Sequence, residues 1–128
     1  MEGPIDTVNR IVDAINRGDL ERAAMLYEPG AVLVAQPGKL ARGSTELREA
    51  LGGLIALKPT LSVEAQEVIE VDGVALYVSR WNLRGTDPAG EAVVMAGESA
   101  DVLRRQEDGR WLIALDNPWG DQILAPRA

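Results

Sequence analysis

The sequence lacks cysteine, histidine and phenylalanine. Without cysteine the chain has no disulfide, no thiolate nucleophile and no thiolate-ligated metal. Without histidine it has no imidazole base, no Ser-His-Asp triad and no imidazole-bound metal or haem. Any catalysis would therefore rest on carboxylates, hydroxyls, amides, lysine or arginine, and we expect neither a cofactor nor a metal.

Positive charge and long apolar runs are also scarce. The chain has 13 Lys and Arg against 20 Asp and Glu, for a net charge of -7. Such a chain repels phosphate backbones, so we expect no nucleic-acid partner. No apolar run approaches the ~20 residues of a membrane span. The first ten residues lack the basic start and apolar run of a signal peptide, so we expect a cytoplasmic protein.

The remaining pattern predicts one α+β domain over residues 1–128. Apolar residues make up 46% of the chain, enough for a packed core. Apolar spacing of the helical period predicts helices over residues 8–15, 20–27 and 44–55. Period-two alternation and turn residues predict strands over 31–35, 40–43, 61–71, 74–84, 92–106 and 110–116, with Asp72-Gly73 as a hairpin turn. Helices that precede an antiparallel meander indicate the α+β class.

Several short segments resemble nuclear transport factor 2-like proteins, and are closest to the SnoaL-like and ketosteroid-isomerase-like branch. They are Asn16-Arg17-Gly18-Asp19-Leu20, the segment from Leu26 to Val32, Arg42-Gly43, Asp108-Gly109-Arg110-Trp111 and Asp116-Asn117-Pro118. The resemblance implies a cystatin-like, cone-shaped barrel, in which a curved, mostly antiparallel sheet wraps around three N-terminal helices. It also implies a deep apolar pocket and a homodimer formed through the outer sheet face. It leaves the activity open, because this superfamily includes isomerases, cyclases, epoxide hydrolases, dehydratases and binding modules.

Asp101 is the main catalytic candidate. Aligned on the final hairpin, it resembles the oxyanion-hole acid of the ketosteroid isomerases. A carboxylic acid in an apolar site can stay protonated and donate a hydrogen bond to a developing oxyanion. The alternative is an ordinary carboxylate paired with Arg80 or Arg104 on a neighbouring strand.

The rest of the isomerase site is missing. Its general base falls near Ala35 or Gln36, and its oxyanion tyrosine falls near Ile11. Since these side chains cannot perform those roles, classical ketosteroid isomerisation is not expected.

The limonene epoxide hydrolases offer a second comparison. Arg80-Trp81-Asn82 resembles their Arg-x-Asp element, with asparagine where the acid is needed. Asp116 resembles their late aspartate and is the second catalytic candidate. Alternatively, Asp116 caps backbone amides in a simple turn with Asn117 and Pro118.

Seven other side chains are expected to line the pocket and bind substrate. Trp81 and Tyr27 each combine a large apolar body with a polar group, and Ser99 and Met95 share the strand face of Asp101. Trp119 could cover the pocket mouth or only a sheet edge. A one-residue change of register would turn Asp101, Ser99 and Trp81 outward. The full set is Tyr27, Gln36, Trp81, Asn82, Met95, Ser99 and Trp119.

Three functions follow as hypotheses. The first is a cofactor-free isomerase, cyclase or lyase acting on a small apolar, polyketide-like or steroid-like molecule. A variant of it is an epoxide-hydrolase-like enzyme whose acid–base pair is degraded. The second is a module that binds such a molecule without chemistry. The third is a structural dimer domain with a packed interior. The scattered glutamates are expected to form cross-strand pairs with arginines and not a metal site: Glu64, Glu67, Glu70, Glu91 and Glu98.

Overall fold

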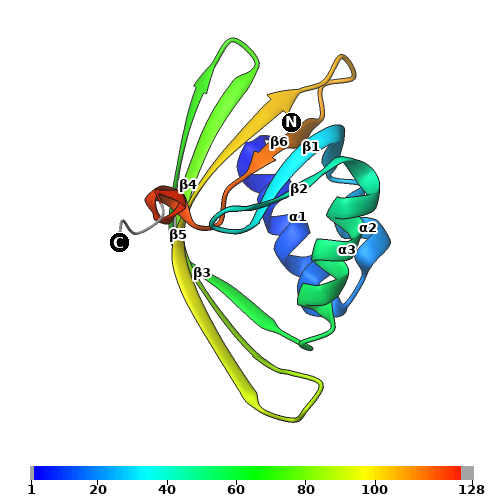
Figure 1. Ribbon diagram of the computed structural model, residues 1–128. Coiled ribbons are helices and arrows are strands. Elements are labelled where there is room, and N and C mark those ends of the chain that lie inside the picture. The colour runs from blue at the N-terminus through cyan, green and yellow to red at the C-terminus, as the bar shows by residue number, and fades with distance from the viewer. Residues whose placement is uncertain (1, 125–128) are drawn as a thin grey trace.

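The structure, a computed structural model, describes residues 2–124 and has three α-helices packed on one face of a six-stranded sheet (Figure 1). The helices are α1 (Pro4–Arg17), α2 (Leu20–Ala24) and α3 (Gly43–Ile55), and a 3-10 helix, η1 (Gly120–Ile123), follows the last strand. The strands are β1 (Tyr27–Gln36), β2 (Lys39–Arg42), β3 (Thr60–Val71), β4 (Val74–Thr86), β5 (Ala92–Arg105) and β6 (Trp111–Asp116). The predicted α+β class is confirmed.

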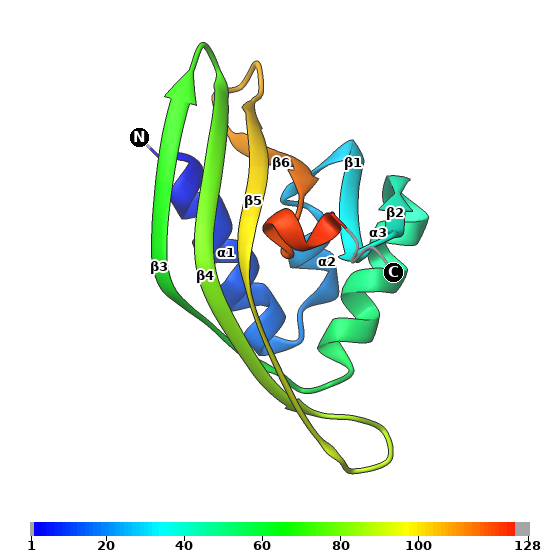
Figure 2. The same cartoon turned by 60° about the vertical axis from the view of Figure 1, so that its left-hand side comes forward.

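The sheet is open. Its strand order is β2-β1-β6-β5-β4-β3, with β1 and β6 parallel and the other neighbours antiparallel. Strands β2 and β3 form the two edges and do not pair with each other, so the predicted barrel is not closed. The long strands β3 to β5 bend around the helices instead (Figures 1 and 2).

The second helix is shorter than its spacing predicts. It ends at Ala24, and Tyr27 already pairs with Ile113 of β6. Proline cannot donate to a strand ladder, and Pro29 falls in the irregular stretch between the Tyr27 and Val32 pairings. The strand continues across that interruption, so Tyr27 is a buried strand residue and not the end of a helix.

Strand register decides which side chains meet the helices. Tyr77 lies opposite Asp101, Ser79 opposite Ser99, and Trp81 opposite Gly97. Partners in register share a sheet face, and this face carries the buried core. The apolar residues that the helices contribute to that core are Val8, Ile11, Ala14, Ile15, Ala23, Leu47 and Leu51.

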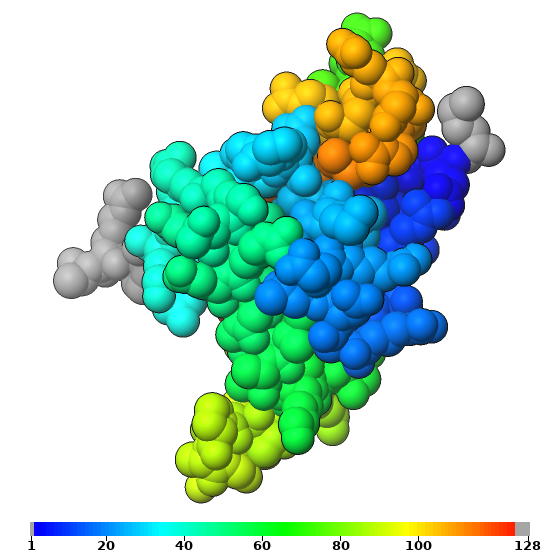
Figure 3. All heavy atoms as spheres, turned by 90° about the vertical axis from the view of Figure 1, so that its right-hand side faces the viewer, coloured from blue at the N-terminus to red at the C-terminus, as the bar shows by residue number. Residues whose placement is uncertain are grey.

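The two sides of the molecule differ. Figure 3 shows the helical side, where α1 to α3 form most of the surface and the turn between β4 and β5 projects beyond them. The opposite side of β3, β4 and β5 has no α-helix over it, and η1 lies beside β5 (Figure 2). Within residues 2–124, no helix is long and apolar enough to cross a bilayer.

Candidate active site around a buried acid pair

Two carboxyl groups meet beneath the sheet. Asp101 lies on β5 and Asp116 ends β6, and their side chains hydrogen-bond to each other. The Tyr27 hydroxyl donates to Asp116 Oδ2 at 2.6 Å. The backbone N–H of Asn117 donates to Asp101 Oδ1 at 2.7 Å. The site therefore combines three strands, β1, β5 and β6, with the turn that follows β6.

Burial determines the protonation of this pair. Asp101 is 5% exposed, and its burial, followed by the charge of Asp116, raises the pKa of Asp101 well above its usual value. Burial also raises the pKa of Asp116, but hydrogen bonds from Tyr27 and Asp101 oppose that shift. Asp116 is therefore the better carboxylate and Asp101 the better acid. Burial and the neighbouring Asp116 raise the pKa of Tyr27 as well, so its hydroxyl remains a donor.

The alternative ion pairs of Asp101 are wrong. Arg80 pairs with Glu98 at 3.3 Å, and Arg104 pairs with Glu28 at 3.0 Å. Among the ion pairs of residues 2–124, none includes Asp101 or Asp116. No cationic side chain among the described residues therefore pairs with either acid.

Hydroxyl groups lie beside the pair on the same face of the sheet. Ser99 lies on β5 two residues before Asp101, and Ser79 Oγ lies 2.6 Å from Ser99 Oγ. The Tyr77 hydroxyl, opposite Asp101 on β4, donates to Gln66 Oε1 at 2.7 Å. Burial raises the pKa of Tyr77 to about 12. Sequence reasoning identified only Ser99 of these four, although the period of two from Trp81 places Ser79 and Tyr77 on the same face.

Two tryptophans pack against each other near Gly97 of β5. Trp81 and Trp119 meet edge to face, with ring centroids 5.6 Å apart. Trp81 Nε1 donates to the Pro118 carbonyl at 2.7 Å, and Trp119 Nε1 donates to the Ala35 carbonyl at 3.1 Å. A Cβ atom at Gly97 would come within 3.1 Å of the Trp81 ring. The two indole rings, which were expected to line an open apolar pocket, therefore pack against each other and bond to backbone carbonyls.

Three predicted site residues lie away from the acid pair. Gln36 is exposed at the end of β1. Asn82 points to the other side of the sheet and donates to Glu64 Oε1 at 2.9 Å, so the Asn82 side chain does not face the acids. Met95 is partly buried opposite Leu83, and it is farther from Asp101 along β5 than Gly97 is.

The turn after β6 is held by asparagine. The Asn117 side chain accepts from the Trp119 backbone N–H at 3.2 Å and donates to the Gly120 carbonyl at 3.0 Å. The capping role that was the alternative for Asp116 therefore belongs to Asn117. Asp116 is free to receive the Tyr27 and Asp101 hydrogen bonds.

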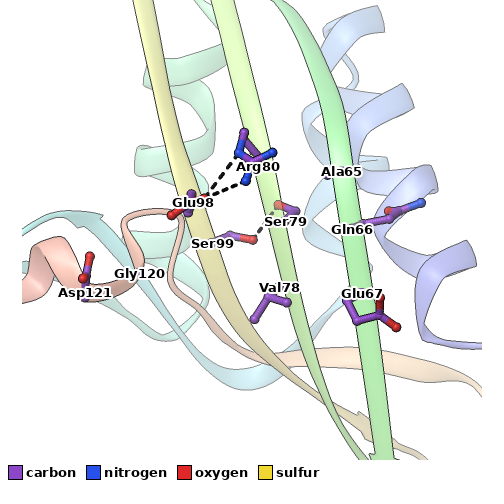
Figure 4. Close-up of a pocket in the computed structure, with 10 residues that line it drawn as sticks. All are labelled: Ala65, Gln66, Glu67, Val78, Ser79, Arg80, Glu98, Ser99, Gly120 and Asp121. Carbon is purple, nitrogen blue, oxygen red and sulfur yellow. Dashed lines mark hydrogen bonds and ion pairs between the residues drawn. The ribbon is translucent and has the colours of Figure 1, made fainter.

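Two surface hollows formed by residues 2–124 do not border Asp101, Asp116 or Tyr27. The larger, of about 450 Å³, is an open groove over β3, β4 and β5 beside η1 (Figure 4). The smaller, of about 200 Å³, lies between the start of α1 and the turn before β6. The part of the chain that the structure describes contains no cluster of acids that could hold a metal ion. The larger groove is lined by Ala65, Gln66, Glu67, Val78, Ser79, Arg80, Glu98, Ser99, Gly120 and Asp121.

The family is shown by the sequence itself. The profile of the SnoaL-like domain matches residues 8–113, and the chain belongs to this family. A search of curated protein sequences gives no significant match.

Solved structures share the fold at low sequence identity. A nuclear transport factor 2-like superfamily protein from Salmonella enterica has a TM-score of 0.79 at 18% identity, over 88% of this chain and 84% of that one. A protein from Shewanella frigidimarina, provisionally classed as a ketosteroid isomerase, has 0.76 at 19% identity, over 87% and 90%. The association domain of CaMKII from C. elegans has 0.69 at 20% identity, over 88% of each chain. At 18–20% identity, these similarities show a shared fold.

We expect Asp101→Asn to make the stability of the protein less dependent on pH. Because the pKa of Asp101 is raised on folding, the folded state holds this proton more tightly than the unfolded chain does. That stabilisation is complete below the ordinary aspartate pKa of about 4, and it is lost as the pH rises through the raised pKa of the folded state. Asparagine keeps one donor and one acceptor in place but does not titrate.

Urea unfolding at a series of pH values measures this effect. The wild-type free energy of unfolding should fall from mildly acidic to alkaline pH, and the Asp101→Asn curve should be flatter. Asp121→Asn, an exposed change on η1, is the matched control and should follow the wild type. Parallel curves for wild type and Asp101→Asn would contradict the shifted proton.

Proposed function

We propose that this SnoaL-like protein is a cofactor-independent acid–base enzyme, an isomerase, cyclase or lyase, acting on a small apolar substrate. The observation that supports this proposal is the acid pair, in which two carboxyl groups lie in hydrogen-bond contact without a cation. Such a pair destabilises a fold, and two acids with different proton affinities form a donor and an acceptor.

Each member of the pair has a chemical role in the proposed reaction. Asp116, as the carboxylate, removes a proton from a substrate carbon next to a carbonyl or a leaving group. Asp101, as the neutral acid, donates its proton or a hydrogen bond to the oxygen that becomes negative. Tyr27 donates to Asp116 in the resting state and becomes available to the substrate oxygen when Asp116 takes up a proton.

The proposed substrate occupies the tryptophan side of the acid pair. Both indole N–H groups are already bonded to backbone carbonyls, so the rings offer mainly apolar contact. Between the rings and Asp101, β5 carries only the small side chain of Ser99 and, at Gly97, no side chain. The substrate would then be apolar, with one oxygen directed at the acids, and its entry would require displacement of Trp119.

A binding module for an apolar molecule is the second candidate. It is favoured by the close contact of Trp81 with Trp119, whose rings offer apolar contact surface. An epoxide-hydrolase-like reaction has less support, because Asn82 bonds to Glu64 on the far side of the sheet.

Turnover assays on wild type and Asp101→Asn separate these functions. The probes are cyclic enones, epoxides and β-hydroxy ketones of one or two rings, with products detected by mass spectrometry and binding by tryptophan fluorescence. We expect wild-type turnover, and a loss of about 100-fold or more in Asp101→Asn. Asp121→Asn should keep full activity. Equal turnover in wild type and Asp101→Asn contradicts the role of Asp101, and saturable binding without any product favours the binding module.

We also propose a homodimer through the sheet face that carries no helix. Val71 lies opposite Val74, Ile69 opposite Leu76, and Val102 opposite both Leu76 and Leu115, so these apolar side chains share one face. A contiguous exposed apolar surface favours burial against a partner. A second copy fits because the patch presents the same apolar chemistry to itself. The outer patch consists of Ile69, Val71, Val74, Leu76, Val78 and Leu115.

Sedimentation velocity tests this dimer. The wild-type chain should sediment at twice its 13.8 kDa mass, and Leu76→Glu should sediment as a monomer. Leu40→Glu is a matched control, because Leu40 is 43% exposed and Leu76 is 42% exposed, but Leu40 lies on β2 at the other end of the sheet. A wild-type monomer at high concentration would overturn the dimer.

A further inference from the structure

The turn after β6 lies between the ends of β1 and β5. Strand β6 ends at Asp116, but both of its neighbours extend farther, β1 as far as Gln36 (Figure 2). On one side of the turn, the Asn117 carbonyl accepts from the Ala100 N–H of β5 at 2.8 Å. On the other side, the Trp119 side chain reaches β1. The turn thus joins β5 to β1 where β6 no longer does.

An irregularity in β1 leaves the Ala35 carbonyl available to Trp119. The register of β1 with β2 shifts between Val34 and Gln36, and Ala35 is the residue between them. Such a shift takes the extra residue out of the strand ladder. The Ala35 carbonyl instead accepts the Trp119 Nε1–H at 3.1 Å. Because a half-buried carbonyl that loses its donor is destabilised, a group that replaces this indole must supply another donor.

The apolar wall of this position is the ring of Trp81. It meets Trp119 edge to face, with 72° between the ring planes and 5.6 Å between the centroids. Trp81 is 8% exposed, and its Nε1–H donates to the Pro118 carbonyl at 2.7 Å. Gly97 leaves room for the ring, because a Cβ atom there would come within 3.1 Å of it. Trp81 is thus a fixed apolar surface, against which another aromatic ring can pack in place of Trp119.

The backbone of the turn is held at both ends, so the indole can move without it. The Asn117 N–H donates to Asp101 Oδ1 at 2.7 Å, and the Asn117 side chain bonds to the backbone of Trp119 and Gly120. A Cβ atom at Gly120 would lie 2.5 Å from the Glu98 carbonyl oxygen, so Gly120 packs directly on β5. Trp119 itself is only half-buried. Rotation of its side chain toward solvent breaks one hydrogen bond and one ring contact, and it leaves the bond to Asp101 intact.

We propose that the Trp119 indole occupies a ligand subsite, and that a ligand displaces it with a flat apolar ring carrying one N–H or O–H group. The ring packs against Trp81, and its N–H or O–H donates to the Ala35 carbonyl. The ligand is not an anion, because a carbonyl oxygen and a chain of net charge -7 both disfavour negative charge. This inference rests on the proposed function, and it narrows the apolar substrate to rings with a hydrogen-bond donor.

An NMR titration with indole tests the subsite, because indole is the group that Trp119 itself places there. The matched probe is benzofuran, which has the same ring size but an oxygen in place of the N–H. Binding is followed by the proton–nitrogen signal of Trp81 Nε1–H. We expect Trp119→Ala to bind indole about tenfold more tightly than benzofuran, because benzofuran leaves the Ala35 carbonyl without a donor. It should also bind indole about tenfold more tightly than the wild type does, since the wild-type side chain competes for the subsite.

Two conservative variants complete the experiment. Trp119→Phe keeps a ring but removes the bond to Ala35, so its indole affinity should exceed that of the wild type by about fivefold. Trp111→Phe makes the same change in the core at the start of β6, and it should leave the indole affinity unchanged. If Trp119→Ala does not fold, the comparison of Trp119→Phe with Trp111→Phe still tests the subsite.

Equal affinity of Trp119→Ala for indole and benzofuran would overturn the donor subsite. An unshifted Trp81 signal in both Trp119 variants would overturn it too, and so would wild-type affinity for indole in both. These titrations need no turnover, so they are separate from the assays on Asp101→Asn. Tight indole binding without turnover of any probe would contradict only the enzyme. Turnover that depends on Asp101, together with no indole binding, would contradict only the subsite.

Discussion

The contact between the carboxyl groups of Asp101 and Asp116 is the constraint on which the rest of the site depends. Two carboxylates at hydrogen-bond distance in the interior would repel each other strongly, and among the described residues no ion pair reaches them. One proton converts that repulsion into a bond. The Tyr27 hydroxyl and the Asn117 amide then satisfy further carboxyl oxygens, so strands β1, β5 and β6 are joined at one point.

This arrangement explains why the two faces of the sheet differ in chemistry. The helix-facing side carries the acids, hydroxyls and tryptophans in successive layers along β4 and β5. The other side presents the outer patch and solvated pairs such as Arg80 with Glu98. One strand can therefore supply two chemically different surfaces, because its alternating residues point to opposite sides of the sheet.

Sequence reasoning predicted the architecture better than the site. Helical and strand periods are local properties, and they placed Asp101 and Ser99 on one face without knowledge of the fold. The contact of Asp101 with Asp116 depends on how β5 pairs with β6, and the role of Tyr27 depends on a strand that continues past Pro29. The contact of Trp81 with Trp119 joins β4 to the turn after β6, which no local pattern encodes.

Carbon-13 NMR of the aspartate carboxyl groups, followed against pH, is the most direct measurement of the shared proton. The account predicts that Asp101 loses its proton at a higher pH than Asp116 does, and that Asp116→Asn lowers the pKa of Asp101 because the neighbouring negative charge is gone. If both carboxyl groups instead ionise together near the ordinary aspartate pKa of about 4, the pair does not share a proton and the account is wrong.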